Sequence, residues 1–273
     1  MDYGIANQGP GNLQVDSTAI LNEAKNLGIQ IVDTAPIYGN AEKVIGQFHT
    51  NNDKFMVHTK ISGGGEITYK KALQSIQNSI RNLNVSKIDV VYFHSPELFL
   101  NGRNNRTIQV INSISETGNV NKLGVSVYLE KEIEIISNDW PEIEVYQVPE
   151  NILDQRLLHS KIISELSESG AEIYVRSIFL QGLALMDSQK VPKHFFEATD
   201  YLESYQNYLL DNKLSRLEAA LNYLNLLKWS SGFIVGVVTV EQLREVLKFK
   251  DTLQLHETLP TPLPHPWVDP RNW

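Results

Sequence analysis

The sequence predicts an α/β protein, a (β/α)8 barrel of the TIM type in which seven strands are recognisable. Short apolar runs recur along the 273 residues, amphipathic helical patterns alternate with them, and the runs start 23 to 60 residues apart. This is the spacing of βα units, because a parallel strand needs a crossover before its neighbour. An open doubly wound sheet is the alternative. We favour the barrel because neither a G-x-G-x-x-G fingerprint nor a phosphate loop follows any candidate strand.

The predicted strands are rich in Val, Ile, Tyr and Phe. They span residues 29–35, 54–62, 89–95, 121–128, 144–150, 172–179 and 232–239. Several are apolar on both faces, as parallel strands covered by helices are. A closed barrel has eight strands, whereas the first residues, MDYGIANQGPGNLQ, are rich in Gly and Asn and predict a loop instead of a strand. Either the given start lies after the first strand, or the barrel is incomplete and has two open edges.

Helices are expected between these strands. Asp16 or Ser17 can cap the first, which Gly28 ends. Further stripes at helical spacing comprise Ala72, Leu73, Ile76, Ile80 and Leu83, then Leu217, Leu221, Leu224 and Trp229. The last helix opens with a capping box over residues 239–242.

We expect a single domain over residues 1–273. It includes an insertion at 180–214 and a Pro-rich tail at 259–273, which we expect to be extended. In the insertion, Tyr201, Tyr205 and Tyr208 have the spacing of one helical face. They fit a packed core, and they also fit a border of the substrate cleft.

Composition excludes several classes of protein. The formal charge of −8 and the lack of Lys/Arg runs argue against nucleic-acid binding. The absence of Cys excludes a disulfide scaffold, a thiolate nucleophile and any Cys-based metal site. The sequence also has no recognisable pair of histidines at helical spacing with a nearby acid, which would indicate another kind of metal site. Without a signal peptide or a run of 18 apolar residues, we expect a cytoplasmic protein that no membrane anchors.

Four polar residues lie at the C-terminal ends of three early strands or in the loop after the first, where barrel enzymes carry their catalytic groups. They are Asp33, Tyr38, Lys60 and His94. Each alone has an ordinary structural explanation, such as a turn cap or a solvated lysine. Together they suggest a catalytic site. A lysine at the inner mouth of a barrel needs a carboxylate partner, and an ammonium group near a tyrosine favours the phenolate form of its side chain. Such a phenol can protonate a developing alkoxide, and an imidazole can orient the carbonyl.

At these residues the sequence resembles the aldo-keto reductases. The segment from Gly28 to Gly46, GIQIVDTAPIYGNAEKVIG, looks like the family signature. His58-Thr-Lys60, Phe93-His94-Ser-Pro96, Gly124-Val-Ser126 and Gln147 follow in the family's order. Residues 176–182 resemble a bacterial branch, and the resemblance covers nearly the whole chain from Tyr3.

The resemblance implies a (β/α)8 barrel that reduces an aldehyde or ketone, sugar-like substrates included, with NAD(P)H. It assigns Tyr38 as proton donor, Asp33 and Lys60 as the pair that tunes it, and His94 as the group that orients the carbonyl. It also implies a set of cofactor-binding residues: Ser126, Gln147, Arg176, Ser177, Gly236, Thr239 and Gln242.

The sequence also departs from the family. Val127 replaces the Asn beside Ser126, and Arg176 replaces the ring that stacks on the nicotinamide. The loop 236–242 has no cation for the adenosine 2′-phosphate, so Thr239 and Gln242 fit helix capping as well as cofactor binding. The loop itself thus offers no cation that would select NADP. NADP is the cofactor expected from the family, and NAD is the alternative.

Two other functions remain open. The chain could be a nucleotide-binding regulatory subunit without turnover, or a degenerate truncated barrel. His58 is expected to be a packed strand residue. The loop 97–105 and Trp267 and Trp273 are expected to border the substrate site.

Overall fold

The computed structural model describes residues 16–63, 66–187, 190–248, 258–269 and 272, and this part of the chain divides into two compact units. The first comprises residues 16–148 and 161–174, which we call the strand unit. The second comprises residues 149–160 and 175 onward, which we call the C-terminal unit. The opening segment expected to be a loop lies outside the described residues, as does Trp273.

The seven predicted strands are present, and they follow one another in the sheet in chain order, β1 to β7. Their bounds are β1 Ile31–Asp33, β2 Met56–Ile61, β3 Ile88–Phe93, β4 Val120–Ser126, β5 Ile143–Pro149, β6 Glu172–Arg176 and β7 Gly232–Phe233. The pairings from β1 to β5 are parallel. Chain order with an intervening helix is the arrangement of a (β/α)8 barrel that is incomplete in the described residues.

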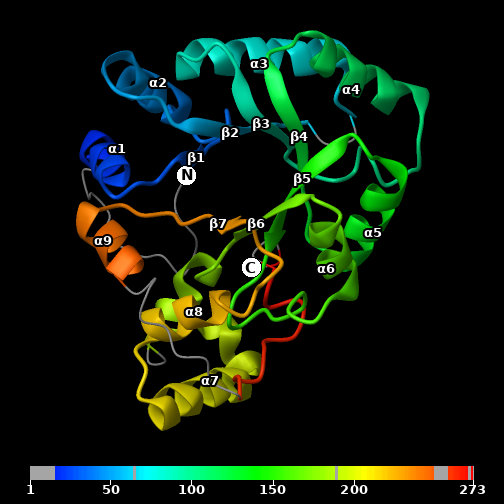
Figure 1. Ribbon diagram of the computed structural model, residues 1–273. Coiled ribbons are helices and arrows are strands. Elements are labelled where there is room, and N and C mark those ends of the chain that lie inside the picture. Colours follow the sequence, from blue (N-terminus) through cyan, green and yellow to red (C-terminus); the bar gives the residue numbers. More distant parts are fainter. Residues whose placement is uncertain (1–15, 64–65, 188–189, 249–257, 270–271, 273) are drawn as a thin grey trace. The chain divides into compact units, whose positions relative to one another are not determined.

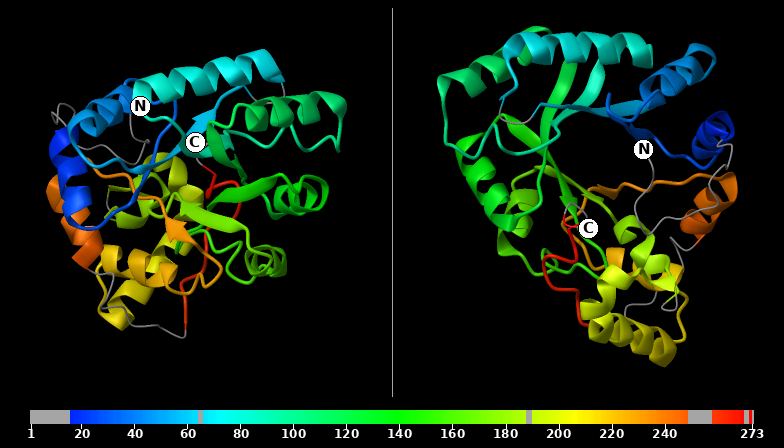
Figure 2. Two further views of the ribbon diagram at one scale, coloured as in Figure 1. Left: turned by 45° about the horizontal axis from the view of Figure 1, so that its top comes forward. Right: turned by 180° about the vertical axis from the view of Figure 1, so that it is seen from behind.

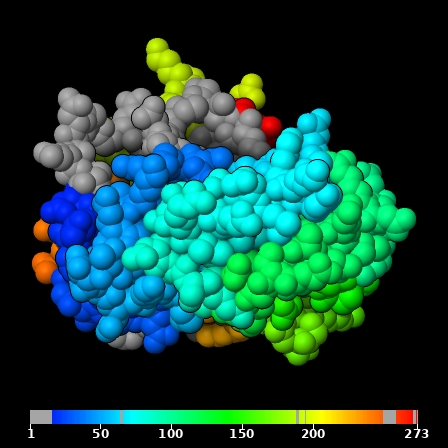
Figure 3. Space-filling view, turned by 90° about the horizontal axis from the view of Figure 1, so that it is seen from above, coloured from blue at the N-terminus to red at the C-terminus, as the bar shows by residue number. Residues whose placement is uncertain are grey.

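Helices alternate with the strands of the strand unit. They are α1 Ser17–Asn26, α2 Ala41–Asn51, α3 Tyr69–Leu83, α4 Asn105–Glu116, α5 Glu130–Asp139 and α6 Lys161–Glu168. Figure 1 shows α2, α3 and α4 beside β1 to β4, and Figure 2 shows them from two other sides. In Figure 3, α3 (cyan) lies between α2 (blue) and α4 (green). Between these helices and the sheet, Ile45 of α2, Val57 of β2 and Leu83 of α3 form a buried apolar cluster.

Helix ends follow the expected local chemistry. Asp16 caps α1, because its Oδ1 accepts from the Ala19 amide at 2.9 Å, and Gly28 after the helix has a φ of 78°. In α2, Gly46 is required by a close contact with α3: a Cβ there would lie 1.9 Å from the Asn82 carbonyl oxygen. Glycine therefore allows the two helices to approach.

The C-terminal unit holds the predicted insertion. Its elements are the 3₁₀ segments η2 Leu180–Leu185 and η4 Lys193–Ala198, the helices α7 Thr199–Asn212, α8 Arg216–Leu224 and α9 Val240–Lys248, and strand β7. The tyrosines of the insertion lie on α7, where Tyr205 and Tyr208 are buried, so they belong mainly to the core of this unit. Along the tail, residues 258–264 have no regular secondary structure, and Leu263 donates its amide to the Leu153 carbonyl at 2.8 Å.

Three predicted boundaries were wrong by three or more residues. The sixth strand ends at Arg176 rather than at residue 179, because Ser177 has a φ of 59° and leaves the extended conformation. The seventh has two residues rather than eight, and the Val238 amide is bonded to the Gln242 side chain instead of a strand. Helix α8 ends at Leu224, so Trp229 lies beyond it.

The described residues contain no helix that is both long and apolar enough to span a bilayer.

Candidate active site

The central feature of the strand unit is a buried ion pair at the ends of β1 and β2. Lys60 Nζ lies 2.5 Å from Asp33 Oδ2 and donates to the Thr34 carbonyl at 3.2 Å. Lys60 is only 4% exposed, so its ammonium has little contact with water and depends on these two acceptors. The predicted partnership between Asp33 and Lys60 is thus present in the structure.

Tyr38 lies in the turn between β1 and α2, beside this pair. Its amide donates to the Ala35 carbonyl at 3.0 Å, its side chain is half-buried, and its ring centroid is 5.3 Å from Lys60 Nζ. At this distance the ammonium makes a cation–π contact with the phenol ring. The structure therefore places the predicted proton donor beside the charged group that was expected to tune it.

His94 follows β3 directly. Its amide donates to the Ile61 carbonyl at 3.0 Å, and its side chain is half-buried. In the pairing of β2 with β3, Lys60 lies opposite Tyr92. Because side chains alternate along a strand, His94 is expected on the same face as Tyr92 and Lys60.

Ser126, the last residue of β4, lies opposite Gln147, two residues before the end of β5, and both are buried. Gln147 also joins the ion pair, because its Nε2 donates to Asp33 Oδ1 at 2.5 Å. The same carboxylate therefore receives a charged hydrogen bond on one oxygen and a neutral one on the other. Val127, which stands where relatives have Asn, is fully buried.

Glu42 supports the site from helix α2. It is buried, and its two carboxylate oxygens accept from Thr59 Oγ1 at 2.9 Å and from Asn82 Nδ2 at 3.2 Å. Thr59 directly precedes Lys60, so this carboxylate ties α2 and α3 to the strand that carries the lysine. The sequence placed Glu42 in the signature segment without assigning it a role.

The other predicted cofactor residues belong to the C-terminal unit. Arg176 ends β6 and donates from Nη1 to Ser177 Oγ at 3.3 Å. Left-handed backbone at Ser177, Leu180 and Gln181 shapes the segment that follows. Such conformations cost energy in residues other than glycine, and they cluster at binding sites.

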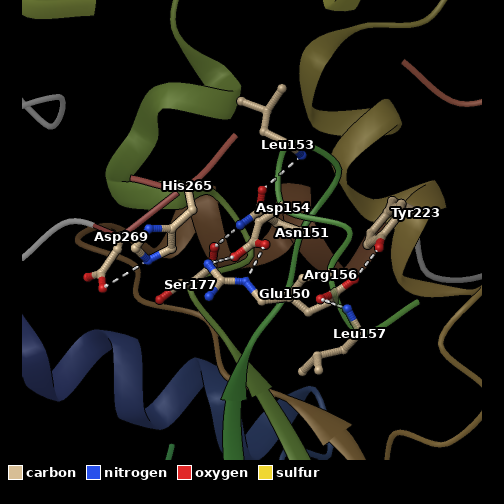
Figure 4. A network of polar contacts seen from close by, with 10 residues as sticks. All are labelled: Glu150, Asn151, Leu153, Asp154, Arg156, Leu157, Ser177, Tyr223, His265 and Asp269. Atoms are coloured by element: carbon tan, nitrogen blue, oxygen red, sulfur yellow. Dashed lines mark hydrogen bonds and ion pairs between the residues drawn. The ribbon is translucent and has the colours of Figure 1, made fainter. Parts of the chain in front are cut away.

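A buried polar network holds this segment (Figure 4). Asn151 Nδ2 donates to the Ser177 carbonyl at 3.1 Å, and the Glu150 carboxyl accepts from the Tyr223 hydroxyl and from the Leu157 amide. Burial raises the pKa of Glu150 well above its usual value, although the Tyr223 hydrogen bond opposes this shift. The network thus fixes the carbonyl of Ser177, the first of the residues with left-handed backbone.

Thr239 and Gln242 cap the start of α9. Thr239 Oγ1 accepts from the Gln242 amide at 3.2 Å, and Gln242 Oε1 accepts from the Val238 amide at 2.9 Å. Gln242 and Gly236 also line a cavity of about 310 Å³ within the C-terminal unit.

Arg216, at the start of α8, lines the same cavity, as does Glu245. The Arg216 guanidinium is held by Gln206 Oε1, at 2.5 Å from Nη2, and lies 5.4 Å from the Tyr205 ring centroid. We did not identify Arg216 from the sequence, because it lies 20 residues before Gly236 in a segment without a binding motif.

Comparisons with known proteins agree with the fold. The Aldo/keto reductase family profile matches residues 3–258. A Pseudomonas aeruginosa protein whose structure carries the name aldo-keto reductase superposes with a TM-score of 0.63 and 17% identity, over 85% of this chain and 81% of that one.

Curated relatives match over shorter stretches. An uncharacterized oxidoreductase of Schizosaccharomyces pombe is 29% identical over 49% of this chain and 51% of its own length. L-galactose dehydrogenase of Arabidopsis thaliana is 26% identical over 41% of this chain and 38% of its own length. A protein of Oryza sativa subsp. japonica, named a probable voltage-gated potassium channel subunit beta, is 27% identical over 30% of this chain and 29% of its own length. The chain therefore matches between about three tenths and half of the length of these relatives. Because the family profile covers nearly all of the sequence, the chain belongs to the Aldo/keto reductase family.

Proposed function

We propose that this chain is an NAD(P)H-dependent oxidoreductase that reduces an aldehyde or ketone to an alcohol. The observation that carries the proposal is the buried Lys60–Asp33 pair with the Tyr38 ring 5.3 Å from the ammonium. A buried lysine whose charge is held by a carboxylate favours deprotonation of a neighbouring phenol. Membership of the family and the oxidoreductase names of two relatives support the same chemistry.

The residues present fit a nicotinamide cofactor. Two buried polar side chains, Ser126 and Gln147, lie opposite each other near the ends of neighbouring strands and can hydrogen-bond a carboxamide. The bound cofactor would supply the hydride. Tyr38 would give its proton to the alkoxide oxygen that forms, Lys60 would stabilise the phenolate that remains, and His94 would hold the carbonyl oxygen in line with the phenol.

The cavity beside Gly236 and Gln242 supports NADPH as the cofactor. Arg216 supplies there the cation that the loop 236–242 lacks, and Gln206 and the Tyr205 ring keep its guanidinium in place. A guanidinium suits a phosphate monoester because it offers paired donors. Glu245 on the same cavity wall disfavours a phosphate, so the balance between the two side chains sets the cofactor preference.

A sugar carbonyl is the substrate class we propose. The segment after His94 contains polar Glu97 and Asn101 together with apolar residues, and polar side chains suit a polyhydroxylated substrate. One relative carries the name of a sugar dehydrogenase.

The activity is tested by following NADPH oxidation with a panel of aldehydes, ketones and reducing sugars. Tyr38→Phe should lower kcat about 10²- to 10⁴-fold, because the proton donor is lost. Tyr69→Phe, which removes a half-buried hydroxyl from α3, is the control and should keep the wild-type rate. A Tyr38→Phe enzyme as fast as wild type would contradict the proposal.

Cofactor preference is tested with Arg216→Ala. The kcat/KM for NADPH should fall about tenfold or more while that for NADH changes less than about twofold, since a charged hydrogen bond to phosphate is lost. Arg81→Ala, on the exposed side of α3, is the matched control. An equal fall in kcat/KM for NADPH and for NADH would show that Arg216 does not bind the phosphate.

A second candidate function is a nucleotide-binding regulatory subunit, which the similarity to the rice channel subunit favours. It predicts tight NADPH binding, no turnover of any carbonyl, and stable association with another protein. Turnover that depends on Tyr38 would exclude it.

A further inference from the structure

The hydrogen bond between Gln147 and Asp33 joins two strands that are not neighbours in the sheet. Asp33 ends β1, Gln147 lies in β5, and β2, β3 and β4 stand between them in the strand order. Such a bond can form because inward side chains of alternate strands share one layer of a barrel. Gln147 Nε2 lies 2.5 Å from Asp33 Oδ1, Gln147 is buried, and the Asp33 side chain is only 13% exposed. The contact therefore crosses the interior of the strand unit.

The two oxygens of the Asp33 carboxylate have different partners. Oδ2 accepts from Lys60 Nζ, and Oδ1 accepts from the Gln147 amide. A carboxylate held at one oxygen can still rotate about its Cβ–Cγ bond, because this terminal torsion has broad minima. The bond from Gln147 removes that freedom, so Oδ2 stays directed at the ammonium.

The same contact determines how the Gln147 amide is oriented. An ionised carboxylate only accepts hydrogen bonds, so the amide must present its nitrogen to Asp33. The amide oxygen is then left as an acceptor for the carboxamide of the proposed cofactor. Gln147 can thus serve the cofactor through its oxygen and Asp33 through its nitrogen.

We propose that Gln147 is a positioning residue for the Asp33–Lys60 pair, in addition to its contact with the cofactor carboxamide. Its amide holds the carboxylate against the ammonium and offsets part of the carboxylate charge. That charge opposes ionisation of Tyr38, whose ring lies 5.3 Å from Lys60 Nζ, so loss of the amide should make the phenol a weaker acid. This effect on the reaction rests on the proposed function, whereas the positioning of Asp33 does not.

The other titratable groups near Asp33 do not change charge in the alkaline range. His58 on β2 and Tyr92 on β3 contact each other, with 3.2 Å between Nδ1 and the hydroxyl oxygen. Burial lowers the pKa of His58 against the opposing charge of Asp33, and burial raises the pKa of Tyr92 well above its usual value. His94 is expected on the same face, and imidazoles change charge on the acidic side of neutrality. An alkaline change in the pH profile therefore reports on Tyr38 and its ammonium partner.

The positioning is tested without any ligand, by NMR of protein labelled with ¹³C at the aspartate carboxyl carbons. The Asp33 signal is identified by its loss in Asp33→Asn/Lys60→Met. Gln147→Met, which keeps the length of the side chain but removes the donor, should move this signal. Gln74→Met is the matched control, because Gln74 is exposed on α3 and its amide donates to Asn78 at 3.1 Å. An Asp33 signal that stays in place in Gln147→Met, or moves equally in Gln74→Met, would overturn the inference whether or not the protein is an enzyme.

Gln147→Glu provides a rescue that depends on pH. A protonated carboxyl at this position can donate to Asp33 Oδ1 as the amide does. Ionisation would instead place two buried carboxylates against each other, which raises the pKa of one of them strongly. The Asp33 signal should therefore lie nearer its wild-type position at pH 5 than at pH 8. A variant in which this signal changes with pH no more than in the wild type would contradict a hydrogen bond between the two positions.

The consequence for the reaction is measured in the pH profile of kcat. The rate should fall above the pKa of the proton donor, and in Gln147→Met this fall should move to higher pH by about 0.5 to 1 pH unit, because one hydrogen bond to the carboxylate is lost. Ser126→Ala removes the other carboxamide partner, so it should raise the KM for NADPH about three- to tenfold and leave the pH profile unchanged.

The same displacement of the pH profile in Ser126→Ala, or none in Gln147→Met, would show that Gln147 acts on the cofactor alone. Wild-type protein with no turnover would refute the proposed function, and the NMR result would still decide the positioning.

Discussion

Lys60 is the residue whose charge determines the chemistry of the strand unit. Its ammonium is almost completely buried and is balanced by Asp33 and the Thr34 carbonyl. A buried ion pair adds little net stability, but removing one partner is costly because the other charge is left without compensation.

Asp33→Asn should therefore reduce the free energy of unfolding by about 3 kcal/mol. Adding Lys60→Met should restore most of this loss, because no buried charge then remains. Urea unfolding of the two variants measures the effect, and a double variant less stable than Asp33→Asn alone would contradict it.

Sequence reasoning identified the residues that match a motif or end a strand, and the structure brings Asp33, Lys60 and Tyr38 together. It did not identify the contact of Tyr92 with His58, or of Arg216 with the cavity. These depend on strand register and on helices distant in sequence, which residue spacing does not specify. Thr239 and Gln242 fitted two functions in the sequence, and the structure shows that both cap α9.

At the scale of elements, the contact between α2 and α3 depends on Gly46. A methyl group there would collide with the Asn82 carbonyl, which is backbone and cannot move aside. Glu42 bridges the same two helices to β2.

Gly46→Ala should therefore destabilise the protein by about 3 kcal/mol or more, since α2 must shift away from α3. Gly118→Ala is the control. Gly118 has a φ of 65° but open space around it, so only about 1 kcal/mol of backbone strain is expected. Thermal unfolding separates the two, and equal losses would show that helix approach is not the cause.

All seven strands could be predicted because their apolar runs are local signals. The ends of strands were harder to predict. Strand β6 stops before a left-handed Ser177, and β7 ends at Phe233, after which the chain leads to Val238, whose amide is bonded to the Gln242 side chain. Neither feature changes the apolar pattern that defined the predicted strands.

At the scale of the whole molecule, the buried network around Glu150 makes stability depend on pH. The raised pKa means that the folded state binds a proton which the unfolded chain loses above its ordinary pKa of 4.5. The contribution of this group is fully present below pH 4.5 and declines by about 1.4 kcal/mol per pH unit above it, until the folded pKa is reached.

Glu150→Gln should remove this decline. The amide oxygen can accept from Leu157 and the amide nitrogen can donate to Tyr223, so the variant resembles the protonated acid. Urea unfolding at pH 5 and pH 8 should show a smaller difference for the variant than for the wild type. Equal differences would mean that Glu150 titrates alike in both states.

Transfer of deuterium from NADPH that carries deuterium at both C4 positions of the nicotinamide tests the central claim most directly. Incubation with a reducible carbonyl and mass spectrometry of the product should show an alcohol heavier by one mass unit with wild type, and almost none with Tyr38→Phe. Unlabelled alcohol from wild type, or as much labelled alcohol from Tyr38→Phe as from wild type in the same time, would contradict the assignment of hydride transfer coupled to protonation by Tyr38.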